Sequence, residues 1–451
     1  MTEFSGTLRR PAAIGLLLAG YAVFLFAAIG WTPLWLDEIQ QCGARAIAYS
    51  SLLRWVQLNP GASPLPYLVQ RAVVNTLGFS ATSARIPTAL CGVLAAFSFL
   101  ALARRSAARN PLIAVLFFAI MPLQLRYSTE ARGYSQGLVF SITSWLLFRR
   151  CIEKPSLSRS LIYSASILAG LYSHPYTIFP VLAQIVYLFL HRARVKYRWR
   201  MVAAAAVAIC FYLPWCVLQR ETQIRDGSVH FYFFSPRQVF PFALVHELTG
   251  GGYVCTICIA ALAAAAAAHR KRPLADLAIL TAVFSIAGPL LFDAGFSYFF
   301  AARQLLFAVP ALALLASDGV EMLADRGWGA VAGALALAFL TSAALKDWRQ
   351  VTVPKDDLAA VARQAGAMLD PRTCVAAAPR REIGYYVFLQ PALAQHVCGD
   401  RPSADAVILA ISQYATAEQK DEVRRDLAAS GYALKSARAV GAGAIDVYDR
   451  E

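Results

Sequence analysis

The sequence predicts an all-α protein that crosses a membrane many times and ends in a small α/β domain. Three observations support this fold class. The mean hydropathy is +0.51, and only 15% of the residues are charged. Apolar runs long enough to enter a bilayer as helices recur between residues 12 and 345. After about Lys346 charges become frequent and the apolar runs shorten, which is typical of a domain outside the membrane.

Clusters of basic residues set the orientation of the predicted spans. They lie between the apolar runs, at 9–10, 104–109, 149–154, 191–200 and 269–272. Such clusters are typical of cytoplasmic loops. They account for the formal net charge of +15 without a nucleic-acid partner. Consecutive clusters must then be separated by an even number of spans.

This rule predicts eleven transmembrane helices, with the N-terminus in the cytoplasm and the C-terminus outside. The N-terminal run shows no clear cleavage site, so we expect it to be retained as the first span. Several spans have about 15 residues, which is short for a bilayer and suits a cavity recessed into the outer leaflet. The predicted spans are about 12–30, 84–103, 111–126, 134–149, 160–173, 176–190, 201–219, 251–268, 274–292, 304–317 and 329–345.

Two long outside loops interrupt the predicted membrane domain, which covers residues 1–345. Both halves of the first loop, residues 31–83, have the pattern of amphipathic helices that lie on the membrane. The second loop, residues 220–250, contains the aromatic residues 231–234, which are typical of an interfacial aromatic belt.

Residues 346–451 are predicted to form the α/β domain. Strands are expected at 373–379 and 405–412, helices at 356–369 and 416–430, and a final strand at 441–450. Two of the nine cysteines, Cys374 and Cys398, fall in this domain and could pair if it lies outside the cytoplasm.

Polar residues gather in the predicted outer turns. Asp37 and Glu38 follow directly on the first span, where ionisable groups are costly and usually tied to function. Each candidate also has a plain structural alternative: Glu130 could pair with Arg132, His174 could end a helix, and Arg303 could reach the membrane interface. Asp293 could likewise be a plain helix-end acid. The full set of further candidates at this depth is Arg126, Tyr127, Glu130, Arg132, Tyr134, His174, Tyr176, Asp293 and Arg303.

These residue types fit transfer of a group from a lipid-borne phosphate to a hydroxyl. Arginine can bind a phosphate through two parallel hydrogen bonds, and a carboxylate can take a proton from a hydroxyl. The sequence contains no P-loop, no GxGxxG after a strand and no HExxH motif. We therefore expect any energy-rich donor to be carried by the membrane or to lie outside it already.

An ordered set of motifs resembles the GT-C superfamily of integral-membrane glycosyltransferases. The similarity is to the bacterial branch that includes relatives of protein O-mannosyltransferases and of the lipid A aminoarabinose transferase, and it covers most of residues 12–320. The motifs are WLDE (35–38), PLPY (64–67), ARIPTAL (84–90), RYSTEARGYS (126–135), SHPYT (173–177) and FAARQLLFAVPALALL (300–315).

The resemblance implies a GT-C fold and transfer of a sugar from a polyprenyl-phosphate donor on the extracytoplasmic side. Asp37 matches the acid that activates the acceptor, with Glu38 beside it. Arg132 and Arg126 match arginines near the donor phosphate. The chain departs from its relatives at Ala62-Ser63, where they often carry Glu-Lys or His, so no metal or phosphate contact is expected there.

The sequence thus predicts an inverting glycosyltransferase with Asp37 and Glu38 as catalytic residues and Asp37 as the general base. Arg126, Arg132, His174 and Arg303 are predicted to bind the donor phosphate. Tyr67, Glu130, Tyr134 and Tyr176 are predicted to contact the acceptor or the sugar. No metal ligand is assigned, although a divalent cation is left open.

The predicted partners are membrane lipids, a polyprenyl-phosphate-sugar and an acceptor that is a glycolipid, a glycan or a protein. The predicted location is a bacterial inner membrane, with a periplasmic active site and C-terminal domain. Two other functions stay open. A glycolipid or lipid-carrier transporter needs coupling residues near the bilayer midplane, whereas the ionisable residues here gather at one face. A non-catalytic envelope scaffold would not depend on Asp37.

Overall fold

The computed structural model describes residues 6–59, 62–106, 110–193, 195, 197–225, 242–268, 275–296, 301–399, 402 and 404–451. The chain divides into two compact units. The first contains Met1–Trp31 and Ala44–Val351, and the second contains Thr32–Gly43 and Thr352–Glu451. Each unit has its own hydrophobic core. The short segment Thr32–Gly43 therefore folds with residues that follow it by more than 300 positions.

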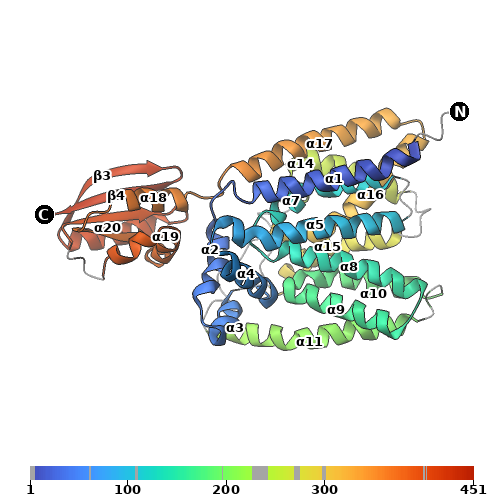
Figure 1. The fold of residues 1–451 in the computed structure, drawn as a ribbon, viewed down its shortest axis with the longest axis horizontal. Helices are drawn as coiled ribbons and strands as arrows, with labels where there is room; N and C mark the ends of the chain where they lie inside the picture. Colours follow the sequence, from blue (N-terminus) through green and yellow to red (C-terminus); the bar gives the residue numbers. More distant parts are fainter. Residues whose placement is uncertain are drawn as a thin grey trace. The chain divides into compact units, whose positions relative to one another are not determined.

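The first unit is helical throughout its described residues. Its long helices lie side by side as a bundle, with α5 against α8, α8 against α9, and α9 against α11 (Figure 1). The elements are α1 (Gly6–Ala28), η1 (Ala44–Ala46), α3 (Tyr49–Leu58), α4 (Pro64–Leu77), α5 (Ala81–Arg105), α6 (Pro111–Ala119), α7 (Pro122–Ser128), α8 (Tyr134–Glu153), α9 (Leu157–Ser173), η2 (Pro175–Thr177), α10 (Ile178–Leu190), α11 (Arg198–Arg225), α13 (Phe242–Glu247), α14 (Gly252–Ala267), α15 (Ala275–Phe296), η4 (Ala302–Ala308), α16 (Val309–Asp325) and α17 (Gly329–Thr352).

Six helices among the described residues are long and apolar enough to cross a membrane. A seventh is added if α6 and α7, which are bent by 60° relative to each other, form one broken span. Two shorter apolar helices cover Pro175–Leu190 and Gly252–Ala267. A helix lies at each of the eleven predicted positions, so the helical segments are confirmed, while the number of spans stays a prediction.

Small and buried polar residues fix how these helices pack. A Cβ atom added at Gly319 would lie 1.9 Å from the carbonyl oxygen of Leu262, so glycine is what lets α16 approach α14 closely. At the start of α5, Arg85 is only 3% exposed and donates a hydrogen bond of 3.0 Å to the carbonyl oxygen of Ile29. The arginine of the ARIPTAL motif therefore satisfies the C-terminal end of α1.

The second unit is an α/β fold around one four-stranded sheet. The strand order is β1-β2-β4-β3, with β1 parallel to β2 and the other pairs antiparallel. The elements are α2 (Leu36–Gly43), α18 (Leu358–Ala367), β1 (Thr373–Ala378), η5 (Arg380–Glu382), α19 (Ile383–Leu389), η6 (Pro391–His396), β2 (Ala406–Ile411), α20 (Ala417–Ala429), β3 (Tyr432–Val440) and β4 (Gly443–Arg450).

Most elements of this unit agree with the sequence prediction. Strands β1, β2 and β4 and helices α18 and α20 are confirmed, as are helices α3 and α4 in the first loop. Strand β3 was not predicted, because it is an edge strand with six consecutive exposed residues and a bulge between Leu434 and Ser436. Without an alternating apolar pattern, only pairing with β4 marks it as a strand. The aromatic residues 231–234 lie outside the described residues.

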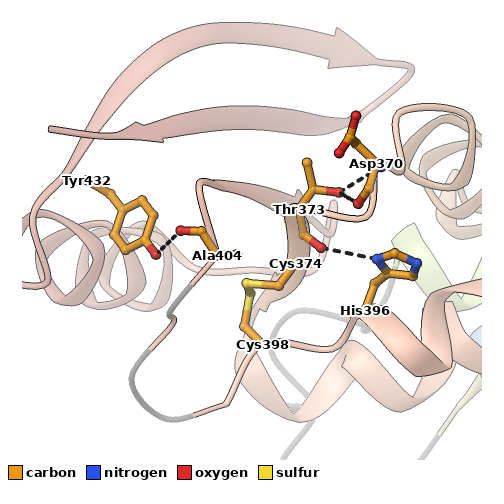
Figure 2. The surroundings of a disulfide bond; sticks show 7 residues. All are labelled: Asp370, Thr373, Cys374, His396, Cys398, Ala404 and Tyr432. Atoms are coloured by element: carbon orange, nitrogen blue, oxygen red, sulfur yellow. Dashed lines mark hydrogen bonds between the residues drawn. A yellow bond between two sulfur atoms is a disulfide. The ribbon is translucent and has the colours of Figure 1, made fainter.

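A disulfide joins Cys374 in β1 to Cys398, which precedes β2 (Figure 2). The pairing considered from the sequence is present. The Cys398 backbone N–H also donates to the carbonyl oxygen of Val375 at 3.0 Å. Close by, the Tyr432 hydroxyl donates to the carbonyl oxygen of Ala404. The crosslink and the first hydrogen bond join Cys398 to the edge strand β1, and the second hydrogen bond joins Ala404 to the opposite edge strand β3.

Candidate functional site

The turn between α7 and α8 carries the first group of candidate residues. The Arg126 guanidinium donates through Nε to Glu130 Oε1 at 3.1 Å, and Glu130 is only 4% exposed. Arg126 also lies within electrostatic reach of Glu247. The sequence left open an ion pair between Glu130 and Arg132; the structure shows an ion pair between Glu130 and Arg126. This pair partly neutralises Arg126.

Two glycines allow the His174 turn to approach α8. A Cβ atom at Gly133 would lie 2.4 Å from Pro66 Cγ and 2.7 Å from the carbonyl oxygen of Ser173. A Cβ atom at Gly137 would lie 3.0 Å from His174 Cβ. The glycine of RYSTEARGYS is therefore a packing requirement that brings PLPY, the α7–α8 turn and the SHPYT turn together.

We expect Gly133→Ala to destabilise the first unit. The added methyl group meets a backbone carbonyl that cannot rotate away, and overpacking of this kind costs about 1–3 kcal/mol. The measurement is the thermal unfolding midpoint in detergent. Gly333→Ala in α17 is the matched control, because no atom lies within 4 Å of its added Cβ. An equal midpoint for both variants would contradict this account of the turn.

His174 is a buried imidazole whose Nδ1 accepts a hydrogen bond. It is 8% exposed, and its Nδ1 accepts a hydrogen bond from the Tyr176 backbone N–H at 3.3 Å. Burial lowers the pKa of the imidazole to about 3, and the positive charges of Arg303 and Arg132 lower it further in the same direction. Since Nδ1 accepts, the proton of the neutral ring is on Nε2, which can donate.

The lowered pKa of His174 also shows that two arginines lie near its ring. Both Arg132 and Arg303 act on its imidazole, and Arg303 acts on Tyr127 as well. Two half-buried arginines from distant segments therefore lie within electrostatic reach of one imidazole in the first unit. They form the arginine–histidine cluster, defined here as Arg132, His174 and Arg303. Such a cluster is suited to an anion with several oxygens.

A row of rings supports this cluster. Ring centroids are 4.7 Å apart for Tyr127 and Tyr134, 4.6 Å for Tyr134 and His174, and 5.3 Å for His174 and Phe307. Tyr134 thus reaches the predicted site as a ring contact of His174. Tyr67 of PLPY is 4% exposed within α4. The rings hold the imidazole in one orientation.

An apolar cavity borders the cluster through Tyr176. The ring of Tyr176 lies 5.6 Å from that of His174 and lines a cavity of about 530 Å³. The sequence did not predict which residues line such a cavity. Its walls come from α9, η2, α10, α11 and α15, whose apolar residues look like ordinary membrane-facing positions. The cavity is lined by Leu171, Pro175, Tyr176, Ile178, Phe179, Leu182, Ile209, Tyr212, Leu213, Cys216, Gln219, Arg220 and Phe292.

Asp37 and Glu38 lie on α2 in the second unit and differ in their surroundings. Glu38 is fully buried, and its Oε2 accepts the Trp35 backbone N–H at 3.2 Å. Glu38 therefore caps its own helix. Asp37 is half-buried and within electrostatic reach of Tyr414. Of the two adjacent acids, Asp37 is the more accessible one.

No group of three or more His, Cys, Asp and Glu side chains suited to holding a metal ion occurs in the described part of the chain. The members of the arginine–histidine cluster are instead positively charged or neutral. They are suited to an anion.

Comparison with known proteins gives the following likenesses. Residues 60–217 match the model of the dolichyl-phosphate-mannose-protein mannosyltransferase family. No curated protein matches the chain in sequence. These 158 residues include PLPY, ARIPTAL, the α7–α8 turn and the His174 turn.

Solved structures share the fold. ArnT from Cupriavidus metallidurans, bound to undecaprenyl phosphate, has a TM-score of 0.59 at 14% identity, over 96% of this chain and 97% of that one. The same protein in the apo state has a TM-score of 0.60 at 15% identity, with the same coverage. The arabinofuranosyltransferase AftD from Mycobacteria has a TM-score of 0.53 at 13% identity, over 96% of this chain and 41% of that one.

Proposed function

We propose that this chain, a membrane protein of the GT-C superfamily, transfers a sugar from a polyprenyl-phosphate donor to a hydroxyl group of an envelope acceptor. The observation that carries the proposal is the arginine–histidine cluster beside an apolar cavity within the first unit. The cluster would bind the charged head group of a polyprenyl phosphate, and the apolar cavity would hold its long isoprenoid tail. The ArnT structure with bound undecaprenyl phosphate supports the same class of lipid.

The proposed reaction inverts the configuration of the sugar. Asp37 takes the proton from the acceptor hydroxyl, and the acceptor oxygen attacks the anomeric carbon. The bond between that carbon and the phosphate oxygen breaks, and its electron pair leaves with the phosphate. A phosphodiester with one negative charge becomes a monoester with up to two, so the leaving group needs positive charge as it departs.

Arg132 and Arg303 are proposed to supply that charge. His174 donates through Nε2, and its neutrality lets the imidazole stand beside two guanidinium groups without a third positive charge. Preorganised donors aimed at developing charge in a site that excludes water supply several kcal/mol of transition-state stabilisation. Arg126, held by Glu130, is proposed to add to the positive field at the phosphate.

The remaining parts of the proposal concern the sugar, the second acid and the membrane. Tyr67, Glu130, Tyr134 and Tyr176 are proposed to contact the sugar or the acceptor, and Glu38 to orient α2. We propose eleven spans within residues 1–345, a cytoplasmic N-terminus, and a periplasmic domain from residue 346 in a bacterial inner membrane. Oxidation of Cys374 and Cys398 supports that location for the domain.

The function is tested by reconstituting the full chain with undecaprenyl-phosphate-linked sugars and envelope lipids or glycans as acceptors. We expect release of undecaprenyl phosphate together with an acceptor that gains one sugar of opposite anomeric configuration. A transporter would instead move the glycolipid between leaflets without cleaving it. Movement without cleavage for every sugar tried would overturn the proposal.

We expect Leu182→Trp to weaken binding of undecaprenyl phosphate at least several-fold, because the indole fills part of the cavity. Binding of a short-chain analogue such as geranyl phosphate should change less, since its tail needs less of that space. Leu90→Trp is the matched control, because Leu90 is 49% exposed on α5. Native mass spectrometry of the detergent-solubilised protein reports both affinities. Equal affinities of the Leu182→Trp variant and the wild type for the long lipid would exclude this cavity as the tail site.

A further inference from the structure

Three side-chain contacts join α2, the helix that carries Asp37, and the residue before it to the rest of the second unit. The Leu36 backbone N–H donates to Asp356 Oδ2 at 2.8 Å. The Gln40 side-chain amide donates to the Tyr385 hydroxyl at 3.1 Å. The Lys355 ammonium group lies 4.1 Å from the centre of the Trp35 ring. The first two contacts hold α2 at both of its turns, and the third holds the residue before it.

Asp356 is the most buried of these anchors. It is 4% exposed, and its Oδ2 also lies 3.4 Å from the Tyr414 hydroxyl. Among the described residues Oδ1 has no hydrogen-bond partner. Burial raises the pKa of this carboxyl, while the backbone N–H groups of Leu36 and Leu358 lower it. A buried carboxylate with one unsatisfied oxygen is costly.

A hydrogen bond to the first residue of α2 offsets part of the cost of burying this carboxylate. Asp356 accepts the N–H of the first residue of α2, one of the donors that a helix leaves unsatisfied at its N-terminus. Asp37 is the next residue along the chain. Moving this N–H moves the Asp37 carboxylate with it, because both belong to the same turn.

Tyr414 connects the two acids electrostatically. Asp356 and Asp37 both act on its hydroxyl, so the phenol stands near both carboxylates. Asp357, Glu382 and Tyr386 also lie within electrostatic reach of Asp356, and all three belong to the second unit.

We infer that Asp356 is a positioning residue, which accepts the Leu36 N–H and so fixes the position from which Asp37 acts. The inference rests on the proposed role of Asp37 as general base. Asp356 itself touches neither substrate nor reacting atoms. Because catalysis is sensitive to displacements of about 1 Å, the loss of this one hydrogen bond should be visible in kcat.

The test compares Asp356→Ala with Asp356→Asn in the full chain. Alanine removes the acceptor, whereas asparagine keeps a carbonyl oxygen that can accept the Leu36 N–H. We expect Asp356→Ala to lower kcat at least 10-fold with KM for the lipid donor unchanged. Asp356→Asn should keep kcat within about 3-fold of wild type. Amide hydrogen exchange at α2 should speed up in the alanine variant only.

Arg424→Ala separates positioning from general stability. It leaves Asp446, which is 1% exposed, without its 2.7 Å ion pair. The second unit should therefore lose stability while α2 keeps its contacts. We expect a lower unfolding midpoint for this variant but an unchanged kcat below that midpoint. If Arg424→Ala lowers kcat as much as Asp356→Ala does, the effect is one of stability and the inference is wrong.

The remaining outcomes also decide the question. Wild-type kcat in Asp356→Ala, or equal losses in the alanine and asparagine variants, would overturn positioning by this hydrogen bond. If the wild type transfers no sugar, the proposed function fails while exchange at α2 still reports whether Asp356 anchors the helix. Unchanged exchange in Asp356→Ala would then overturn the anchor itself. If the alanine variant does not fold, wild-type kcat and exchange in the asparagine variant support the inference, and a loss of either overturns it.

Discussion

Sugar transfer should fall about 10²–10⁴-fold in Asp37→Asn, the range that general base catalysis supplies. The amide keeps the shape of the carboxylate but cannot take the proton of the acceptor hydroxyl. Asp37 is half-buried on α2, and asparagine keeps an acceptor oxygen in the same place, so folding should be retained. The measurement is kcat for release of undecaprenyl phosphate from the reconstituted donor, together with the unfolding midpoint.

Two further variants complete this experiment. Glu418→Gln makes the same chemical change at an exposed position of α20 and should leave kcat unchanged. Glu38→Gln should affect the unfolding midpoint more than the Asp37 variant does, because Glu38 is fully buried and caps its helix. Near wild-type kcat in Asp37→Asn would remove Asp37 from the mechanism.

The second large effect is expected at the arginines of the arginine–histidine cluster. Arg132→Ala and Arg303→Ala should each weaken binding of undecaprenyl phosphate about 10–100-fold, because one charge-assisted hydrogen bond contributes about 1.5–3 kcal/mol. Both side chains are half-buried beside His174, so their charges are less screened than those of exposed residues. Lysine at either position should restore part of the affinity by returning the charge without the paired donors.

Arg192→Ala is the matched control, since Arg192 is exposed and follows α10 in a basic cluster. It should bind the lipid as the wild type does. Isothermal titration or native mass spectrometry with undecaprenyl phosphate measures all four proteins under the same salt concentration. If Arg132→Ala, Arg303→Ala and Arg192→Ala bind equally well, the cluster does not hold the phosphate.

Local sequence patterns predicted part of the candidate site. The motif RYSTEARGYS predicted a turn rich in polar residues. Its glycine, Gly133, is required for close packing against Pro66 and Ser173. The helical segments were also predictable, because a backbone in hydrocarbon must satisfy its own hydrogen bonds. The ion pair between Glu130 and Arg126 was not, since local sequence does not show whether the turn geometry brings Arg126 within reach of Glu130.

The sequence by itself determined the membrane class, the helical positions, most of the sheet and the residue types available for chemistry. Tertiary structure alone decided that the pKa of His174 is lowered, that Glu38 is fully buried while Asp37 is half-buried, and that Asp356 accepts a hydrogen bond from the first residue of α2. The physical reason is common to all three. Protonation, burial and helix capping depend on neighbours such as Arg303 for His174 and Asp356 for Leu36, which are remote in the chain.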